Sequence, residues 1–128
     1  MKTDMKTARQ DHACVMFHDA SSSYVLVAGG RSGANTYSKS TEMYFLNGTV
    51  VEGTPMNEER GDFTMAFIEA PEPRVYAIGG VTSWWPRLKS IEFWDSSLTW
   101  KLSRVEMMSK RNGFGSVTVP KSMLRDYC

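Results

Sequence analysis

Two short runs that each end in a pair of glycines constrain the fold of this chain more than any other feature. Tyr24–Gly30 has the sequence YVLVAGG, and Val75–Gly80 has the sequence VYAIGG. Runs rich in β-branched and aromatic residues favour strands, and paired glycines let the backbone take positive φ in a tight turn. Each run therefore predicts a strand that ends in such a turn.

Other residues recur with the same interval of about 50 residues, which indicates a repeat. They are Met5, Met56 and Met107; Arg9, Arg60 and Arg111; Ser40 and Ser90; and Glu42 and Glu92. A strand repeat of about this length matches the kelch motif, in which each repeat forms one four-stranded blade of a β-propeller. On these residues the chain resembles the kelch-repeat family.

The second repeat is the better match to the kelch order of arginine, double glycine, aromatic residue and tryptophan. It contains Arg60, the strand FTMAFI, VYAIGG, SIEFWD at 90–95 and then Trp100. The first repeat has Phe45 in place of Asp95 and Val50 in place of Trp100. We therefore expect the outer part of the first blade to pack less tightly.

The resemblance implies an all-β fold of kelch-type propeller blades, each made of four antiparallel strands. The repeats span residues 5–55 and 56–106, and residues 107–128 hold the first strand of a third repeat, GFGSVTV, and a tail. Propellers close at roughly four to eight blades. We therefore expect about two blades of an incomplete ring, as the C-terminal part of a longer protein.

The inner strand of each repeat is expected at His12–Phe17, Phe63–Ile68 and Gly113–Val119. These runs are almost continuously apolar, which predicts burial on both faces, with Cys14 as a small buried residue. TEMYF and IEFWD are expected as third strands, followed by outer strands in NGTVVEG and DSSLTWKLS. The residues expected to build the blades are Gly29, Gly30, Gly79, Gly80, Glu42, Glu92, Trp94 and Trp100.

Composition and motifs argue against several classes of function. The chain has 15 basic and 14 acidic residues, so no overall field attracts nucleic acid. It has no long apolar run and no signal-peptide pattern at MKTDMKTARQ, so we expect no membrane association and favour the cytoplasm over secretion. The sequon at Asn47 is explained by its Asn-Gly turn.

His12 and His18 lack carboxylate partners at a zinc-like spacing, and no catalytic or phosphate-binding motif occurs, so we expect no metal, cofactor or enzymatic activity.

Two sets of residues are candidates for binding a partner. Arg9, Arg60 and Arg111 each precede an inner strand, where successive blades would place guanidinium groups around one mouth of the channel. In kelch domains that capture acidic peptides, arginines at this repeat position contact carboxylates. The alternative is that each arginine only hydrogen-bonds neighbouring loop carbonyls.

The second set lies in the long loops after the double glycines, RSGANTYSK and VTSWWPRLK, which the repeat places on one face. Its members are Arg31, Tyr37, Trp84, Trp85 and Arg87. Tryptophan and arginine are favoured interface anchors. The alternative for the tryptophans is that one of them covers a blade edge.

These features predict a non-catalytic module that binds a protein or an acidic peptide. The resemblance also implies a more specific role, substrate recruitment for a cullin-type ubiquitin ligase. The alternatives are a structural, actin-associated or extracellular adhesive kelch protein and, more distantly, a galactose-oxidase-like enzyme. We also expect the isolated chain to bind the missing blades of its propeller or to self-associate.

Overall fold

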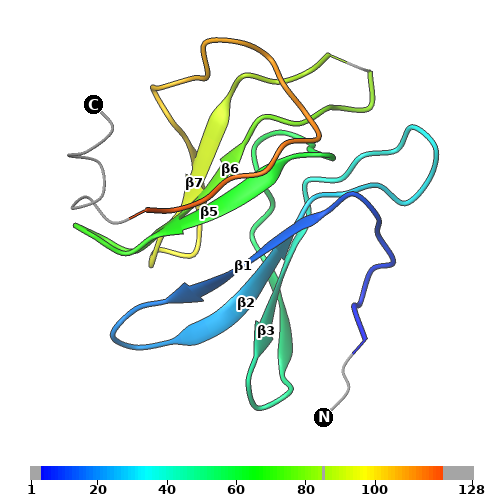
Figure 1. The fold of residues 1–128 in the computed structure, drawn as a ribbon. Coiled ribbons are helices and arrows are strands. Elements are labelled where there is room, and N and C mark those ends of the chain that lie inside the picture. Colours follow the sequence, from blue (N-terminus) through cyan, green and yellow to red (C-terminus); the bar gives the residue numbers. More distant parts are fainter. Residues whose placement is uncertain (1–3, 85, 120–128) are drawn as a thin grey trace.

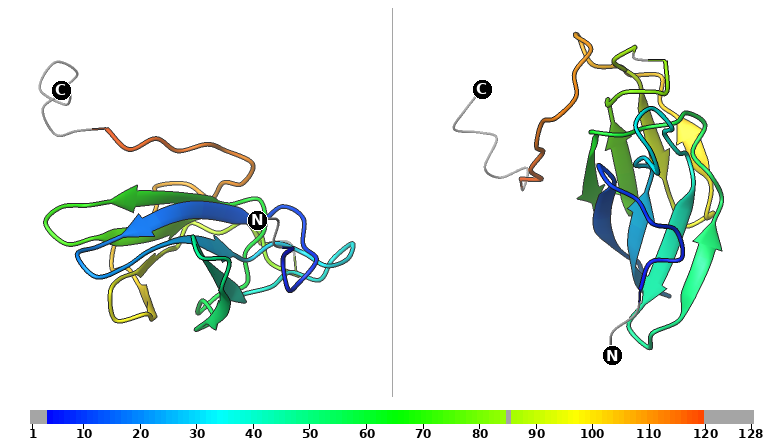
Figure 2. Two further views of the ribbon diagram at one scale, coloured as in Figure 1. Left: turned by 90° about the horizontal axis from the view of Figure 1, so that it is seen from below. Right: turned by 90° about the vertical axis from the view of Figure 1, so that its right-hand side faces the viewer.

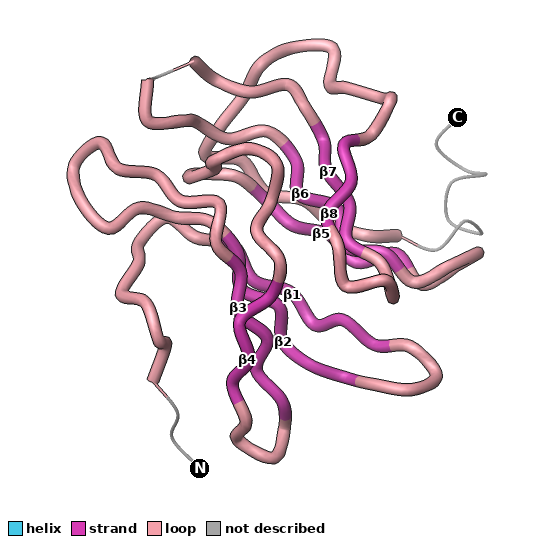
Figure 3. Tube along the Cα trace, turned by 180° about the vertical axis from the view of Figure 1, so that it is seen from behind, coloured by secondary structure: helices cyan, strands magenta, loops and turns pink. Residues whose placement is uncertain are grey.

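The computed structural model describes residues 4–84 and 86–119, which form an all-β structure. It has eight strands: β1 (Ala13–His18), β2 (Ser23–Ala28), β3 (Thr41–Phe45), β4 (Val50–Gly53), β5 (Thr64–Ile68), β6 (Arg74–Ile78), β7 (Ile91–Trp94) and β8 (Trp100–Leu102). They form two four-stranded antiparallel sheets, β1-β2-β3-β4 and β5-β6-β7-β8 (Figures 1 and 3). No helix in the described part of the chain is long and apolar enough to cross a membrane.

Each sheet is a meander because every strand pairs with the next one along the chain. Equivalent pairings recur in the two sheets: Val27 lies opposite Glu42 in the first, and Ala77 lies opposite Glu92 in the second. The glycine pairs follow β2 and β6 directly, and all four glycines have positive φ. The prediction of two sheets with four antiparallel strands each is therefore confirmed.

A single apolar core joins the two sheets. Phe17, Tyr24 and Leu26 enter it from the first sheet, and Val75 and Trp94 enter it from the second. β1 packs beside β5 and β6, so the inner parts of the sheets are adjacent. The core is thus shared between the repeats rather than divided into one core for each sheet.

The inner strand β1 differs from the prediction that it would be buried on both faces. Its residues alternate between more and less buried positions, and Cys14 and Met16 are exposed. β1 is the edge strand of its sheet, and only one of its faces packs against the second sheet. The prediction that Cys14 is buried is therefore wrong, because its side chain lies on the uncovered face.

The expected inner strand of the third repeat, Gly113–Val119, is not formed as a paired strand. The segment instead runs alongside β5 (Figures 1 and 2), where Ser116 and Thr118 donate side-chain hydrogen bonds to the carbonyls of Met65 and Phe67. In the complete repeats the inner strand pairs with the double-glycine strand. The third repeat has no such strand within the described residues, so its backbone has nothing to pair with.

The backbone contacts between successive repeats recur at equivalent residues. Gly30 N donates to Arg60 O at 2.8 Å, and Gly80 N donates to Arg111 O at 3.0 Å. Met56 N likewise donates to Lys39 O, and Met107 N to Lys89 O, each at 2.8 Å. Residues 107–113 therefore contact the second repeat in the way that residues 56–62 contact the first.

The outer strands differ as their sequences predict. Trp100 of β8 packs against Trp94, with 5.5 Å between the ring centroids, and both side chains are buried. Val50 occupies the corresponding place in β4 and is only partly buried. A large aromatic pair therefore holds the outer part of the second sheet but not of the first.

Candidate functional site

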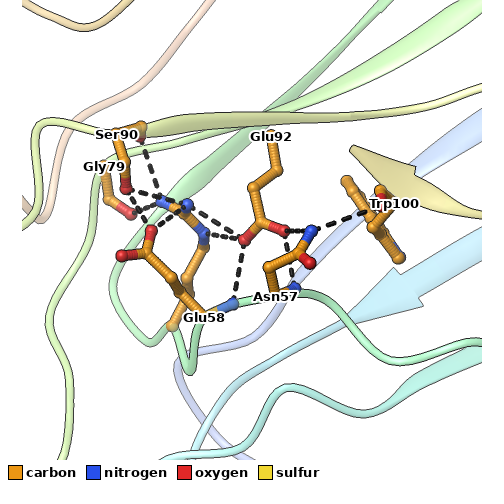
Figure 4. A network of polar contacts seen from close by, with 7 residues as sticks. Asn57, Glu58, Gly79, Ser90, Glu92 and Trp100 are labelled. Atoms are coloured by element: carbon orange, nitrogen blue, oxygen red, sulfur yellow. Dashed lines mark hydrogen bonds and ion pairs between the residues drawn. The ribbon is translucent and has the colours of Figure 1, made fainter. Parts of the chain in front are cut away.

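The side chain of Arg60 is buried and belongs to a polar network in the second repeat. Figure 4 labels its partners Glu58, Gly79, Ser90 and Glu92. The guanidinium group of Arg60 donates to the carbonyls of Gly79 (2.8 Å) and Ser90 (3.1 Å) and to both Glu92 and Glu58. Both side chains of the Arg60–Glu92 ion pair have 0% exposure. The network joins the segment before β5 to the ends of β6 and β7, so its role is to hold the second sheet together.

Arg9 makes the equivalent contacts in the first repeat. It donates to the carbonyls of Gly29 (2.7 Å) and Ser40 (3.2 Å) and to Glu42 (2.6 Å). The side chains of Arg9 and Glu42 are each only 2% exposed. We call each such arrangement of an arginine, two carbonyls and a glutamate an arginine clamp.

The clamps change the interpretation of the arginines as a ring that binds a partner. The guanidinium groups of Arg9 and Arg60 are buried, and their donors are directed at residues of the same repeat. A ligand at a channel mouth could not reach them without breaking these bonds. The structure corresponds to the alternative interpretation, hydrogen bonding to neighbouring loop carbonyls, with a buried carboxylate added.

Arg111 differs from the other two arginines. Its backbone lies in the equivalent position, but its side chain is exposed, and its guanidinium group donates to Ser109 at 2.9 Å. No glutamate pairs with it among the described residues. Arg111 is thus the one arginine of the three that faces solvent in the described structure.

The loops after the double glycines lie at the same end of the sheets as the segments that precede the inner strands. Isolated bridges pair Arg31 with both Gln10 and Tyr37, and they pair Val81 with both Gly61 and Arg87. We call the surface formed by residues 31–37, 81–84, 86 and 87 the loop rim. The predicted common face for these loops is therefore present in the backbone.

Trp84 is the most prominent side chain of the loop rim, with 89% of its surface exposed. Arg87 is also exposed, whereas Arg31 and Tyr37 are partly buried. Trp85 lies outside the described residues. Trp84 therefore does not cover a blade edge, and with Arg87 it gives the rim an aromatic and basic character.

Polar contacts connect the two loops of the rim. Ser83 accepts a hydrogen bond from Tyr37 N at 3.1 Å and donates to Glu59 at 2.6 Å. Arg31 forms an ion pair with Asp11, and this hydrogen bond, with the charge of Asp11, raises the pKa of Arg31. The Tyr37 ring lies directly over Gly61. The first loop is thus fixed to both repeats. The second loop is held through Ser83, the residue that precedes Trp84.

Two titratable groups of the first clamp have shifted pKa values. Burial alone would raise the pKa of Glu42, but hydrogen bonds from Tyr44 and Arg9 outweigh it and leave this pKa below its usual value. Burial and the hydrogen bond to Glu42 raise the pKa of Tyr44 to about 12. Both shifts favour a charged Glu42 and a neutral Tyr44, which is the state that the clamp requires.

No group of three or more histidine, cysteine or acidic side chains suited to a metal ion occurs in residues 4–84 and 86–119. The ring of His18 packs on Phe67, with 4.6 Å between the centroids, and Nδ1 of His12 is buried without a hydrogen-bond partner. The two histidines do not come together as ligands.

Sequence reasoning missed several residues of these networks. Asn57 donates from its backbone and its side chain to Glu92, and Glu58 forms an ion pair with Arg60 (Figure 4). Asp11 and Asp62 have positive φ at equivalent positions, and Asp62 N donates to Asp11 O. The aspartates recur with the period of the arginines, which was a usable signal, whereas Asn57 and Glu58 are replaced by Lys6 and Thr7 in the first repeat.

Comparison with known proteins gave little further information. No family model matches the chain. The chain is similar to adenylate dimethylallyltransferase from Allorhizobium ampelinum (strain ATCC BAA-846 / DSM 112012 / S4), with 29% identity over 87 residues, or 66% of this chain. The match spans 37% of that protein's length. A similarity this low and this partial does not assign the chain to the transferase family.

Proposed function

We propose that the two sheets are consecutive blades of a kelch-type β-propeller and that the chain acts as a non-catalytic platform for binding a protein or peptide. The repeated clamps, glycine pairs and contacts between repeats support the propeller interpretation. Substrate recruitment for a ubiquitin ligase is one form of this proposal, and a BTB domain upstream in a longer chain would favour it.

The observation that carries the proposal is the exposure of Trp84 on a loop that is otherwise anchored. Trp84 is 89% exposed, and tryptophan and arginine are enriched among the residues that dominate interface energetics. Arg87 on the same loop can pair with a carboxylate. The loop rim therefore suits an extended peptide that carries Glu or Asp.

A displayed library of random peptides, selected on the whole chain, tests the proposal. We expect enrichment of acidic sequences that bind the wild type and lose binding to Trp84→Ala and to Arg87→Ala. Leu46→Ala and Arg104→Ala are matched controls, since both residues are exposed outside the rim. Enriched peptides that bind the rim variants and the wild type equally would place the binding surface elsewhere.

A further inference from the structure

The residue two positions before the clamp arginine differs between the repeats, and a cavity lies beside it in the first repeat. In the second repeat, the Glu58 carboxylate pairs with Arg60 at 2.8 Å and accepts a hydrogen bond from the Ser90 hydroxyl (Figure 4). The equivalent residues in the first repeat are Thr7, Arg9 and Ser40. Threonine has no carboxylate, so the first repeat has no equivalent of the Glu58 group between the arginine and the serine.

A cavity of about 300 Å³ lies where this carboxylate is absent. Thr7, Arg9 and Ser40 all line it, and the remaining lining residues are Thr41, Glu42, Glu52, Gly53 and Pro55. We call it the Arg9 cavity. Thr7, Glu52 and Pro55 are exposed, so the cavity is open to solvent on their side.

The Arg9 guanidinium has fewer partners than that of Arg60 at the position that Glu58 fills. Nη2 of Arg60 donates to Glu92, to Glu58 and to the Ser90 hydroxyl. Nη2 of Arg9 donates to Glu42. A carboxylate in the place of Glu58 would accept a further hydrogen bond from Arg9 Nη2, and bonds between charged groups are strong.

We propose that the Arg9 cavity binds a carboxylate, which takes the place that the Glu58 side chain fills in the second repeat. The carboxylate accepts hydrogen bonds from the Arg9 guanidinium and from the Ser40 hydroxyl, which then accepts from the Ser38 hydroxyl, 2.9 Å away. Its source is either an acidic side chain of a peptide or a small carboxylic acid, since both present the same group. The site does not depend on the proposed function, because it is separate from the loop rim.

The charges around the cavity permit this ligand but limit its affinity. Arg9 already pairs with Glu42, yet Arg60 shows that one arginine of this kind can hold two carboxylates, Glu58 and Glu92. Glu52 is an additional negative charge, because Leu102 occupies the equivalent position in the second repeat. Glu52 therefore repels the ligand, and its neutralisation should strengthen binding.

The test follows the Arg9 Nε–H resonance by NMR while glutarate, or a capped peptide with a single Glu, is added to the whole chain at constant ionic strength. We expect saturable shifts. Thr7→Glu should fill the cavity with its own carboxylate and weaken binding by about tenfold or more, since bonds to charged groups are strong. Thr7→Val, which keeps the size of threonine, is the matched control and should retain binding, and Glu52→Gln should strengthen it.

The two ligands identify the source of the carboxylate. Tighter binding of the peptide indicates an acidic side chain, and tighter binding of glutarate indicates a small acid; either result supports the site. The same shifts with chloride in place of the carboxylates would overturn the proposal. It would equally fail if Thr7→Glu bound both ligands as the wild type does.

Discussion

A single residue in the turn between β7 and β8 carries strain that its counterpart in the first sheet avoids. Leu98 has a φ of 56°, and Gly48 has a φ of 86° in the equivalent turn. Both residues donate the hydrogen bond that closes the turn, to Asp95 O and Phe45 O respectively. A left-handed conformation is costly for a residue with a Cβ atom, so the second turn forms despite its sequence.

Replacing this leucine with glycine should therefore stabilise the protein. Relief of the strain outweighs the entropy that glycine loses on folding, so Leu98→Gly should raise the free energy of unfolding by up to about 1 kcal/mol. Urea denaturation measures the change. Leu46→Gly, in the first turn, is the matched control and should lower stability, because Leu46 does not have positive φ; a gain in both variants would exclude relief of strain as the cause.

We expect Glu42 to make the free energy of unfolding fall at acid pH. Its pKa is lowered in the folded protein, so it contributes stability above its unfolded pKa, near 4.5, and this contribution is lost as the pH falls through the folded value. Tyr44→Phe removes one of the hydrogen bonds that lower this pKa. Thermal melting between pH 2 and 7 should show a smaller loss on the acid side for this variant, about 1 kcal/mol less. Parallel curves for the variant and the wild type would contradict this role for Tyr44.

At the scale of elements, the arginine clamps hold together strand ends that the sheet hydrogen bonds do not reach. Arg60→Met should lower the free energy of unfolding by about 3 to 5 kcal/mol, because it leaves Glu92 buried without its charge partner. Arg111→Met is the control, since this side chain is exposed, and should change stability by no more than about 0.5 kcal/mol. Urea titrations of the two variants compare them directly, and equal effects would show that the buried pair adds no stability.

The glycine pairs are the points at which successive repeats meet. A Cβ atom on Gly79 would lie 2.7 Å from Arg111 O, and one on Gly80 would lie 2.7 Å from Gly61 O, while both residues have positive φ. Gly79→Val and Gly80→Val should therefore each destabilise the protein by at least about 1 to 3 kcal/mol. Gly115→Val is the control, because a Cβ atom there meets nothing within 4 Å. Unchanged urea midpoints for Gly79→Val and Gly80→Val would show that neither position requires glycine.

The strands and their order followed from the sequence because those signals are local. The alternating runs and the glycine pairs occur within a few residues of the structures they specify, and β2 and β6 end where predicted. The periodic arginines were also evident, but their orientation was not. Whether Arg60 faces a ligand or Glu92 depends on packing across about 30 residues. The recurrence of Glu42 and Glu92 with the arginines was a usable signal for the clamp, since a buried arginine requires a carboxylate, but sequence reasoning did not pair them.

The failures of prediction have a common physical cause. Composition predicts burial for Cys14 and a paired strand for Gly113–Val119, but burial and pairing depend on what lies beside these residues. An apolar run becomes a buried strand only when a partner covers it. The Arg9 cavity likewise depends on neighbouring side chains, since Thr7, one of the residues that line it, stands at the position of Glu58.

For the whole molecule, contacts between the repeats make the two sheets one folded unit. Trp94 Nε1 donates to Tyr24 Oη at 2.9 Å inside the shared core, and Thr54 Oγ1 donates to Leu98 O at 2.7 Å near its edge. The hydrogen bond between this buried tryptophan and tyrosine links β7 of the second sheet to β2 of the first. We therefore expect the sheets to unfold together.

The same architecture leaves apolar side chains exposed on residues 113–119 and on β1. Val117 is 83% exposed on the unpaired segment, and Met16 is 43% exposed on β1. Open backbone groups beside exposed apolar side chains favour association with another chain. The 128-residue chain on its own should thus self-associate as its concentration rises, which light scattering coupled to size-exclusion chromatography measures. Val117→Lys should reduce this association, whereas Leu46→Lys, at an equally exposed leucine in the β3–β4 turn, should not. A monodisperse monomer at every concentration, or an equal effect of the two lysines, would show that the segment 113–119 is not an association surface.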